Sequence, residues 1–125
     1  MPLMKPKPIS PKLHALIDYG LVGSLLTVPS LLGFSDSVKK LYTAEALALF
    51  VYIALTDQPV AVKPLIPFPV HGKIDPFNIG QFALQTFLKP FQADRKARLF
   101  NVGFTALASL TVLMTDWHGP TKTNP

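Results

Sequence analysis

The sequence contains no cysteine, and only 15% of its 125 residues are charged. The absence of cysteine excludes disulfide bonds, thiolate metal ligands and a cysteine nucleophile. Soluble domains usually carry about 25% charged residues, so the deficit indicates apolar surface that is covered by lipid or by a partner. With 49% hydrophobic residues and a mean hydropathy of +0.33, an integral membrane protein is the simplest interpretation.

The sequence also lacks the motifs of common enzymes and of nucleic-acid-binding proteins. It has no nucleophile elbow, phosphate-binding loop, Rossmann glycine pattern or HExxH zinc motif. The net charge is +5, but no run of five basic residues occurs, so we expect no nucleic-acid partner. We therefore expect a protein without autonomous catalysis.

The chain is built from a tandem repeat. His14 and Asp18 recur 57 residues later as His71 and Asp75. Each pair precedes an apolar stretch, a polar turn and a second apolar stretch. The pattern predicts an all-α fold, a four-helix transmembrane bundle made of two tandem helical hairpins. The predicted parts are a proline-rich tail at 1–10, a membrane domain at 11–116 with hairpins 11–57 and 70–116, and a second tail at 117–125.

Capping signals predict where the helices begin and end. Ser10 followed by proline is typical of a helix start, and Gly33 of a helix end. Ser35, Asp36 and Ser37 offer caps for the second helix, and Asp94 caps the fourth. The predicted helices span 11–32, 36–56, 76–89 and 94–115. Asp75 before Pro76 suggests an N-cap for the third helix, although a start near Val70 with a kink at Pro76 is an alternative.

Three of these helices have about 20 residues, the length that spans a bilayer, whereas 76–89 would be too short. We expect a multi-pass protein of the bacterial inner membrane, with the lipid bilayer and other membrane-protein subunits as partners. Basic residues divide evenly between the two sides, so orientation stays open. A soluble up-down bundle is the alternative that the short third helix favours.

Residues 25–34, which read Leu-Leu-Thr-Val-Pro-Ser-Leu-Leu-Gly-Phe, resemble the small bacterial membrane proteins with SPW repeats. In that family a Ser-Pro-Trp motif ends the first helix of a two-helix unit, and the tryptophan is missing here. The resemblance implies a four-helix membrane protein of two repeats and uncharacterised function. It implies no catalytic residue.

Antiparallel helices would gather most of the marked polar residues at one end of the bundle. These are His14, Asp18, Asp57, His71, Asp75, Asp116 and His118. The pair His14 and Asp18 has i, i+4 spacing and shares one helix face. Three interpretations stay open: helix caps and structural hydrogen bonds, a polar or proton-handling site, and a metal or haem site with His14, His71 and Asp18 as candidate ligands.

Glu45 stands out because it falls inside an apolar helix. An ionisable residue in a spanning segment indicates a functional site, and Arg98 is a candidate partner. Asp75, Asn78 and Gln81 form a polar stripe on the third helix. If the stripes face inward, they form either interhelical hydrogen bonds or a water-filled cleft.

Two functions follow from these observations. The first is an accessory or structural subunit that docks onto a larger membrane complex, and no cofactor is expected for it. The alternative is a stand-alone bundle with a pocket that binds a small ligand, a metal ion or protons. The candidate pocket residues are His14, Asp18, Glu45, His71, Asp75, Asn78 and Gln81.

Overall fold

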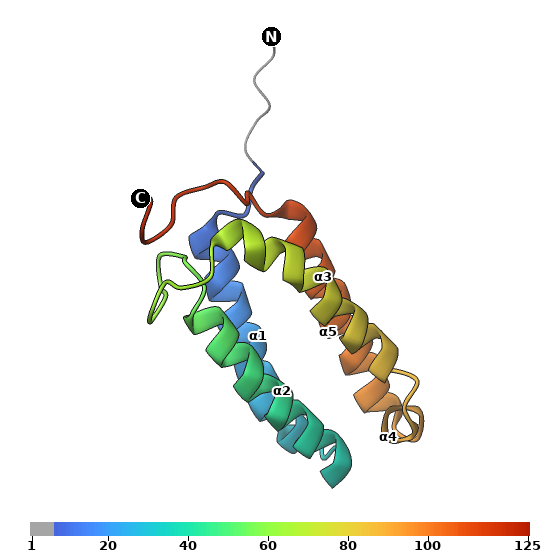
Figure 1. Cartoon of the computed structure of the whole chain (residues 1–125). Coiled ribbons are helices and arrows are strands. Elements are labelled where there is room, and N and C mark those ends of the chain that lie inside the picture. The colour runs from blue at the N-terminus through green and yellow to red at the C-terminus, as the bar shows by residue number, and fades with distance from the viewer. Residues whose placement is uncertain (1–6) are drawn as a thin grey trace.

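The computed structural model of the chain describes residues 7–125, and this range is all-α, as predicted (Figure 1). Four long helices are present, and a one-turn helix lies in the connection between the last two. Their bounds are α1 (Pro11–Leu31), α2 (Asp36–Ala54), α3 (Phe68–Gln85), α4 (Lys89–Gln92) and α5 (Arg95–Met114). Residues 1–6 of the predicted tail lie outside the described part of the chain.

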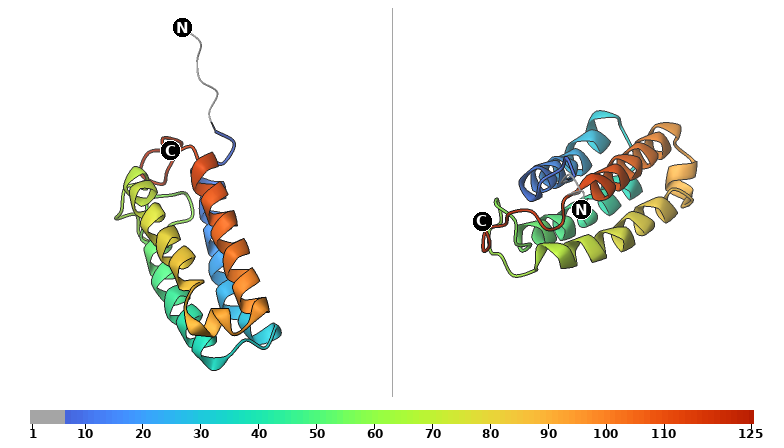
Figure 2. Two further views of the ribbon diagram at one scale, coloured as in Figure 1. Left: turned by 90° about the vertical axis from the view of Figure 1, so that its right-hand side faces the viewer. Right: turned by 90° about the horizontal axis from the view of Figure 1, so that it is seen from above.

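The helices form two antiparallel hairpins, as the repeat predicts. Helix α1 packs along α2, α3 packs along α5, and the two hairpins join where α1 approaches α5 (Figures 1 and 2). The first turns of α1 and α3 lie at the same end as the last turns of α2 and α5. The topology therefore brings both His/Asp pairs to one end of the bundle.

The predicted capping residues act as caps. The side chains of Ser10 and Ser35 accept hydrogen bonds from the backbone amides three residues ahead, at 3.2 and 3.3 Å. Asp94 accepts from the Lys96 amide at 3.0 Å and begins α5. Gly33 ends α1 with φ of 67°, a left-handed conformation that glycine adopts without steric cost.

The N-cap predicted at Asp75 is wrong, and the alternative start near Val70 is close to the observed one. Helix α3 begins at Phe68, eight residues before Pro76, and Asp75 lies inside it rather than at an N-cap. Pro69 occupies the first turn, where its missing N–H is harmless. Pro76 lies within the helix without ending it. The longer helix leaves the Asp75 carboxylate free to face the bundle interior.

A buried polar network crosses the core at the opposite end of the bundle. Asn101 Oδ1 accepts from the Tyr42 hydroxyl and from the Gln85 amide, both at 2.8 Å. Asn101 Nδ2 donates to the Phe82 carbonyl at 2.8 Å and to Thr86 Oγ1 at 2.7 Å. The network joins α2, α3 and α5, and it is the interhelical hydrogen bonding expected for part of the polar stripes.

The outer surface is strongly apolar. Leu31 and Phe77 are each 81% exposed, and large apolar side chains are exposed on all four long helices. By length and hydropathy, one helix within residues 7–125 could cross a membrane, the segment Arg95–Met114. Three spanning helices were expected, so the multi-pass arrangement stays a proposal.

We predict that Asn101→Ala destabilises the fold by about 2–4 kcal/mol, because it leaves the Tyr42 hydroxyl and the Gln85 amide buried without their shared partner. Thermal unfolding followed by circular dichroism measures the change. Ser24→Ala is the matched control, since Ser24 donates only to the Leu21 carbonyl of its own helix. Equal unfolding midpoints for the two variants would contradict the role of the network.

Candidate metal centre

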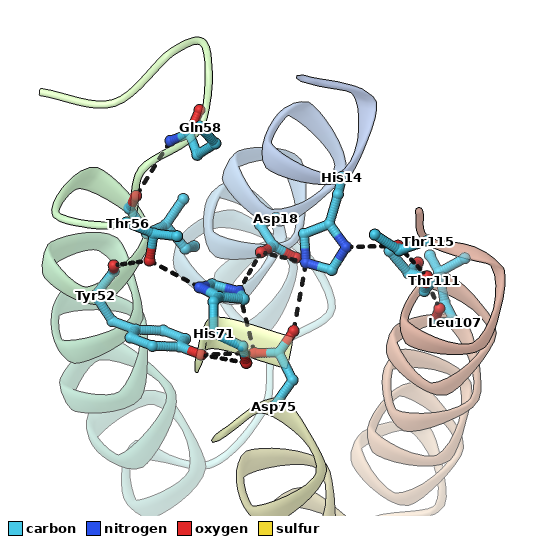
Figure 3. Close-up of polar contacts among 11 residues, drawn as sticks. His14, Asp18, Tyr52, Thr56, Gln58, His71, Asp75, Leu107, Thr111 and Thr115 are labelled. Carbon is cyan, nitrogen blue, oxygen red and sulfur yellow. Dashed lines mark hydrogen bonds and ion pairs between the residues drawn. The ribbon is translucent and has the colours of Figure 1, made fainter. Parts of the chain in front are cut away.

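The two His/Asp pairs meet in one buried cluster, which we call the quartet: His14, Asp18, His71 and Asp75 (Figure 3). Each imidazole Nε2 faces both carboxylates. The His14 distances are 3.1 Å to Asp18 and 3.3 Å to Asp75. The His71 distances are 3.3 Å to Asp18 and 3.1 Å to Asp75. Both histidines are 1% exposed, so water does not screen these interactions.

Two threonines at the helix ends fix the orientation of the imidazoles. The Thr115 hydroxyl donates to the Thr111 carbonyl, and the Thr56 hydroxyl donates to the Tyr52 carbonyl. A hydroxyl has a single hydrogen, so each threonine oxygen must accept from the histidine beside it.

The histidine atom involved is Nδ1, which lies 2.8 Å from the threonine oxygen in both His14–Thr115 and His71–Thr56. Each Nδ1 therefore carries a hydrogen. The Nε2 atom is left to hold either a proton or a metal ion. Such outer partners fix the tautomer of metal-binding histidines in general.

Positive charge is required between the four side chains. Neither Nε2 atom has a hydrogen-bond partner of good geometry, although the carboxylate oxygens lie close by. Two neutral imidazoles would point lone pairs at two buried carboxylates, and buried charge without a partner is strongly unfavourable. The site therefore needs either two protons or one divalent cation.

The spacing of the four groups suits a metal ion. Ligands arranged tetrahedrally about 2.0–2.1 Å from a zinc ion lie roughly 3.3 Å from one another. The four histidine–carboxylate distances run from 3.1 to 3.3 Å. One ligand atom from each residue lies within 4.8 Å of all the others. A small inward movement would enclose an ion.

Haem, which was considered for His14 and His71, does not fit this site. Both Nε2 atoms point at carboxylates within 3.3 Å, so Asp18 and Asp75 occupy the space that a porphyrin would need. The cavity that adjoins these carboxylates has a volume of only about 50 Å³.

Aromatic side chains enclose the quartet. The Tyr52 ring stacks on His71 with centroids 4.2 Å apart, and its hydroxyl lies 3.0 Å from Asp75 Oδ1. Trp117 and Phe68 pack against His14, at centroid distances of 4.9 and 5.5 Å. Trp117 thus lies against the cluster.

The other polar residues expected at this end do not join the quartet. Asp116 accepts from the His118 amide at 3.1 Å, and the His118 side chain is exposed. Asp57 accepts from Thr121 at 3.0 Å and also from Thr123. Slight burial disfavours the charge of Asp57, but these hydrogen bonds outweigh it and hold its pKa below the usual range.

The remaining predicted site residues form a separate group between α2 and α3. Glu45 Oε2 lies 3.3 Å from the Gln81 amide, and Oε1 has no partner. The proposed pairing with Arg98 is wrong, because the Arg98 guanidinium donates to the Gln92 carbonyl. Glu45, Asn78 and Gln81 line an open groove of about 300 Å³.

The two repeats are arranged nearly symmetrically around the quartet. The Asp116 amide donates to the Ile9 carbonyl at 2.8 Å, and the Asp57 amide donates to the Ile66 carbonyl at 2.7 Å. Both acceptors lie five residues before the histidine of their repeat. The end of each hairpin is thus tied to the segment that precedes its quartet helix.

Sequence reasoning missed the threonines, Tyr52 as a carboxylate partner and the aromatic cover. A signal for Thr56 and Thr115 was present, since both immediately precede the aspartates that mark the ends of the repeats. Comparison with protein-family models, curated proteins and solved structures finds no match to this chain. The function must therefore be argued from the site itself.

We predict that Gly72→Ala displaces Trp117. A Cβ atom at position 72 would lie 2.7 Å from the indole ring, closer than the packing of the two groups allows. Trp117 is the only tryptophan, so its fluorescence should shift to longer wavelength as the ring becomes exposed. Gly80→Ala on the same helix is the control, because nothing lies within 4 Å of its Cβ position. Identical spectra for both variants would contradict the packing of Trp117.

Proposed function

We propose that the protein binds one divalent transition-metal ion in the quartet. The proposal depends on the two buried Nε2 atoms of His14 and His71. Each Nε2 lacks a hydrogen unless its imidazole is protonated, and each points at two carboxylates. Imidazole nitrogen combined with carboxylate oxygen suits zinc, iron, cobalt and manganese. The four ligands come from two helices, so the ion would also join the hairpins.

Charge balance supports this assignment. A divalent ion with two aspartates and two neutral histidines has no net charge, which favours burial. Without metal, protonation of both imidazoles gives the same neutral total. Metal binding is then an exchange of one ion for two protons, and metal affinity should fall as the pH is lowered.

The apolar exterior supports a second part of the function, residence in a lipid bilayer. Leu31, Phe77 and Phe87 are each more than three-quarters exposed, and large exposed apolar patches mark protein or membrane contact. We propose a multi-pass bundle whose outer faces contact lipid and the helices of a larger membrane complex. We also propose a similarity to the SPW-repeat proteins, and because these are membrane proteins it is consistent with residence in a bilayer.

We predict that the purified protein binds one Co²⁺ or Zn²⁺ ion per chain. Cobalt should quench Trp117, which lies against His14, and should give the visible absorption of a tetrahedral site. His71→Ala should weaken binding by at least about 100-fold, because loss of outer partners alone costs 10–100-fold. Titration followed by fluorescence and metal analysis measures both effects.

His118→Ala is the matched control for histidine removal, since that exposed side chain lies outside the quartet. It should bind cobalt as the unmodified protein does. The absence of stoichiometric metal in the unmodified protein, or equal loss in both variants, would overturn the metal assignment.

We predict that the protein stays in membranes washed with alkaline carbonate, and that mild detergent extracts it together with other membrane proteins. Retention follows from the apolar exterior, and co-extraction from docking against other helices. Recovery in the soluble fraction would contradict membrane residence. Extraction as a small particle of this chain alone would contradict the accessory role and leave the metal site unaffected.

A further inference from the structure

Glu45 is a buried carboxylate with one unpartnered oxygen. It is 8% exposed, and its Oε1 atom has no hydrogen-bond donor. Within residues 7–125, no lysine, arginine or histidine forms an ion pair with it. The hydrogen bond that it accepts from the Gln81 amide is long, at 3.3 Å. A carboxylate in this setting attracts a cation, and in the membrane-spanning arrangement proposed above such residues commonly mark ion pathways.

The groove at Glu45 adjoins the small cavity beside the quartet. Four residues form a common wall between this groove and the small cavity that adjoins Asp18 and Asp75: Leu49, Tyr52, Asn78 and Phe82. Asn78 lies one turn from Asp75 on α3, between the quartet and Gln81. Glu45 lies seven residues before Tyr52 on α2, about 10 Å along the helix.

The two seams between the hairpins differ in their lining, and Glu45 with its amide neighbours lies in the α2/α3 seam. Counting by the repeat, the α1 residues that correspond to Asn78 and Gln81 are Leu21 and Ser24. The hairpin ends Thr56 and Thr115 lie 59 residues apart, and counted from them the α5 residue that corresponds to Glu45 is Phe104. The α1/α5 seam therefore presents Leu21 and Phe104, which line the cavity as apolar walls. The tail end of the quartet is closed by Trp117 and Phe68.

We propose that Glu45, Asn78 and Gln81 form a relay site that binds a divalent cation transiently on its way through the α2/α3 groove to the quartet. The inference rests on the proposed metal function. A carboxylate and two amide oxygens are weak oxygen ligands for such an ion, whereas the quartet adds two imidazoles. The ion is thus held loosely at the relay site and firmly in the quartet.

Cobalt-binding kinetics test the relay, with Trp117 fluorescence as the signal in the full-length protein. Glu45→Gln removes the charge and keeps the shape of the side chain. A residue on the route changes the free-energy barrier to metal entry and release, and it leaves the free energies of the metal-free and metal-bound protein unchanged. We expect association and dissociation rates to fall together by about tenfold, the lower end of electrostatic rate effects. The equilibrium dissociation constant should change by less than about threefold.

Two further variants keep the test specific. Asp36→Asn removes one exposed negative charge from the same helix, and its rates should equal those of the unmodified protein. Asn78→Leu copies the residue at the corresponding position of α1 and should slow both rates as Glu45→Gln does. It preserves Glu45, so it tests the route without removing a buried charge.

The measured rates and affinities distinguish failure of the relay from failure of the metal site. Unchanged rates in Glu45→Gln and Asn78→Leu would overturn the relay while leaving the metal site intact. Loss of equilibrium affinity in Glu45→Gln with an unchanged association rate would make Glu45 a partner of the bound ion and would also overturn the relay. Failure of the unmodified protein to bind cobalt would overturn both proposals.

Discussion

The neutrality of the buried quartet is the constraint on which the rest of this structure depends. Two carboxylates with little exposure sit between α1 and α3, and each is within 3.3 Å of both imidazoles. Burial makes uncompensated charge unfavourable, so α1 and α3 can meet only if positive charge lies between them. Protons and a divalent ion both satisfy this requirement. The same contact therefore joins the two hairpins and limits the occupant of the site to protons or a divalent ion.

The repeat supplies each component of this contact twice. The i, i+4 spacing places His14 beside Asp18 and His71 beside Asp75 on their helix faces. The threonines at the ends of α2 and α5 accept from Nδ1, which directs Nε2 inward. Because outer partners set the tautomer and basicity of metal ligands, the second helix of each hairpin would support the proposed metal site without supplying a ligand.

The sequence was sufficient for features that depend on local interactions. The caps at Ser10, Ser35 and Asp94 act within three residues, and Gly33 needs only its own backbone conformation. The N-cap interpretation of Asp75 was wrong because Asp-Pro is typical of a helix start, whereas Pro67 and Pro69 begin the helix about two turns earlier, near the alternative start at Val70. The role of Thr115 depends on His14, 101 residues away in the chain, and no local pattern predicts such a contact.

The departures from the repeat are as informative as the repeat itself. A symmetric site requires only equivalent histidines, aspartates and threonines, and both repeats contain them. Around them the two seams differ: Phe104 and Leu21 fill one, while Glu45 and Asn78 line the other. Packing alone would favour apolar residues on both sides, because an unpartnered buried carboxylate is unfavourable. The presence of Glu45 at that position is explained if a cation passes through the α2/α3 seam, and the quartet is the site at which that cation would be held.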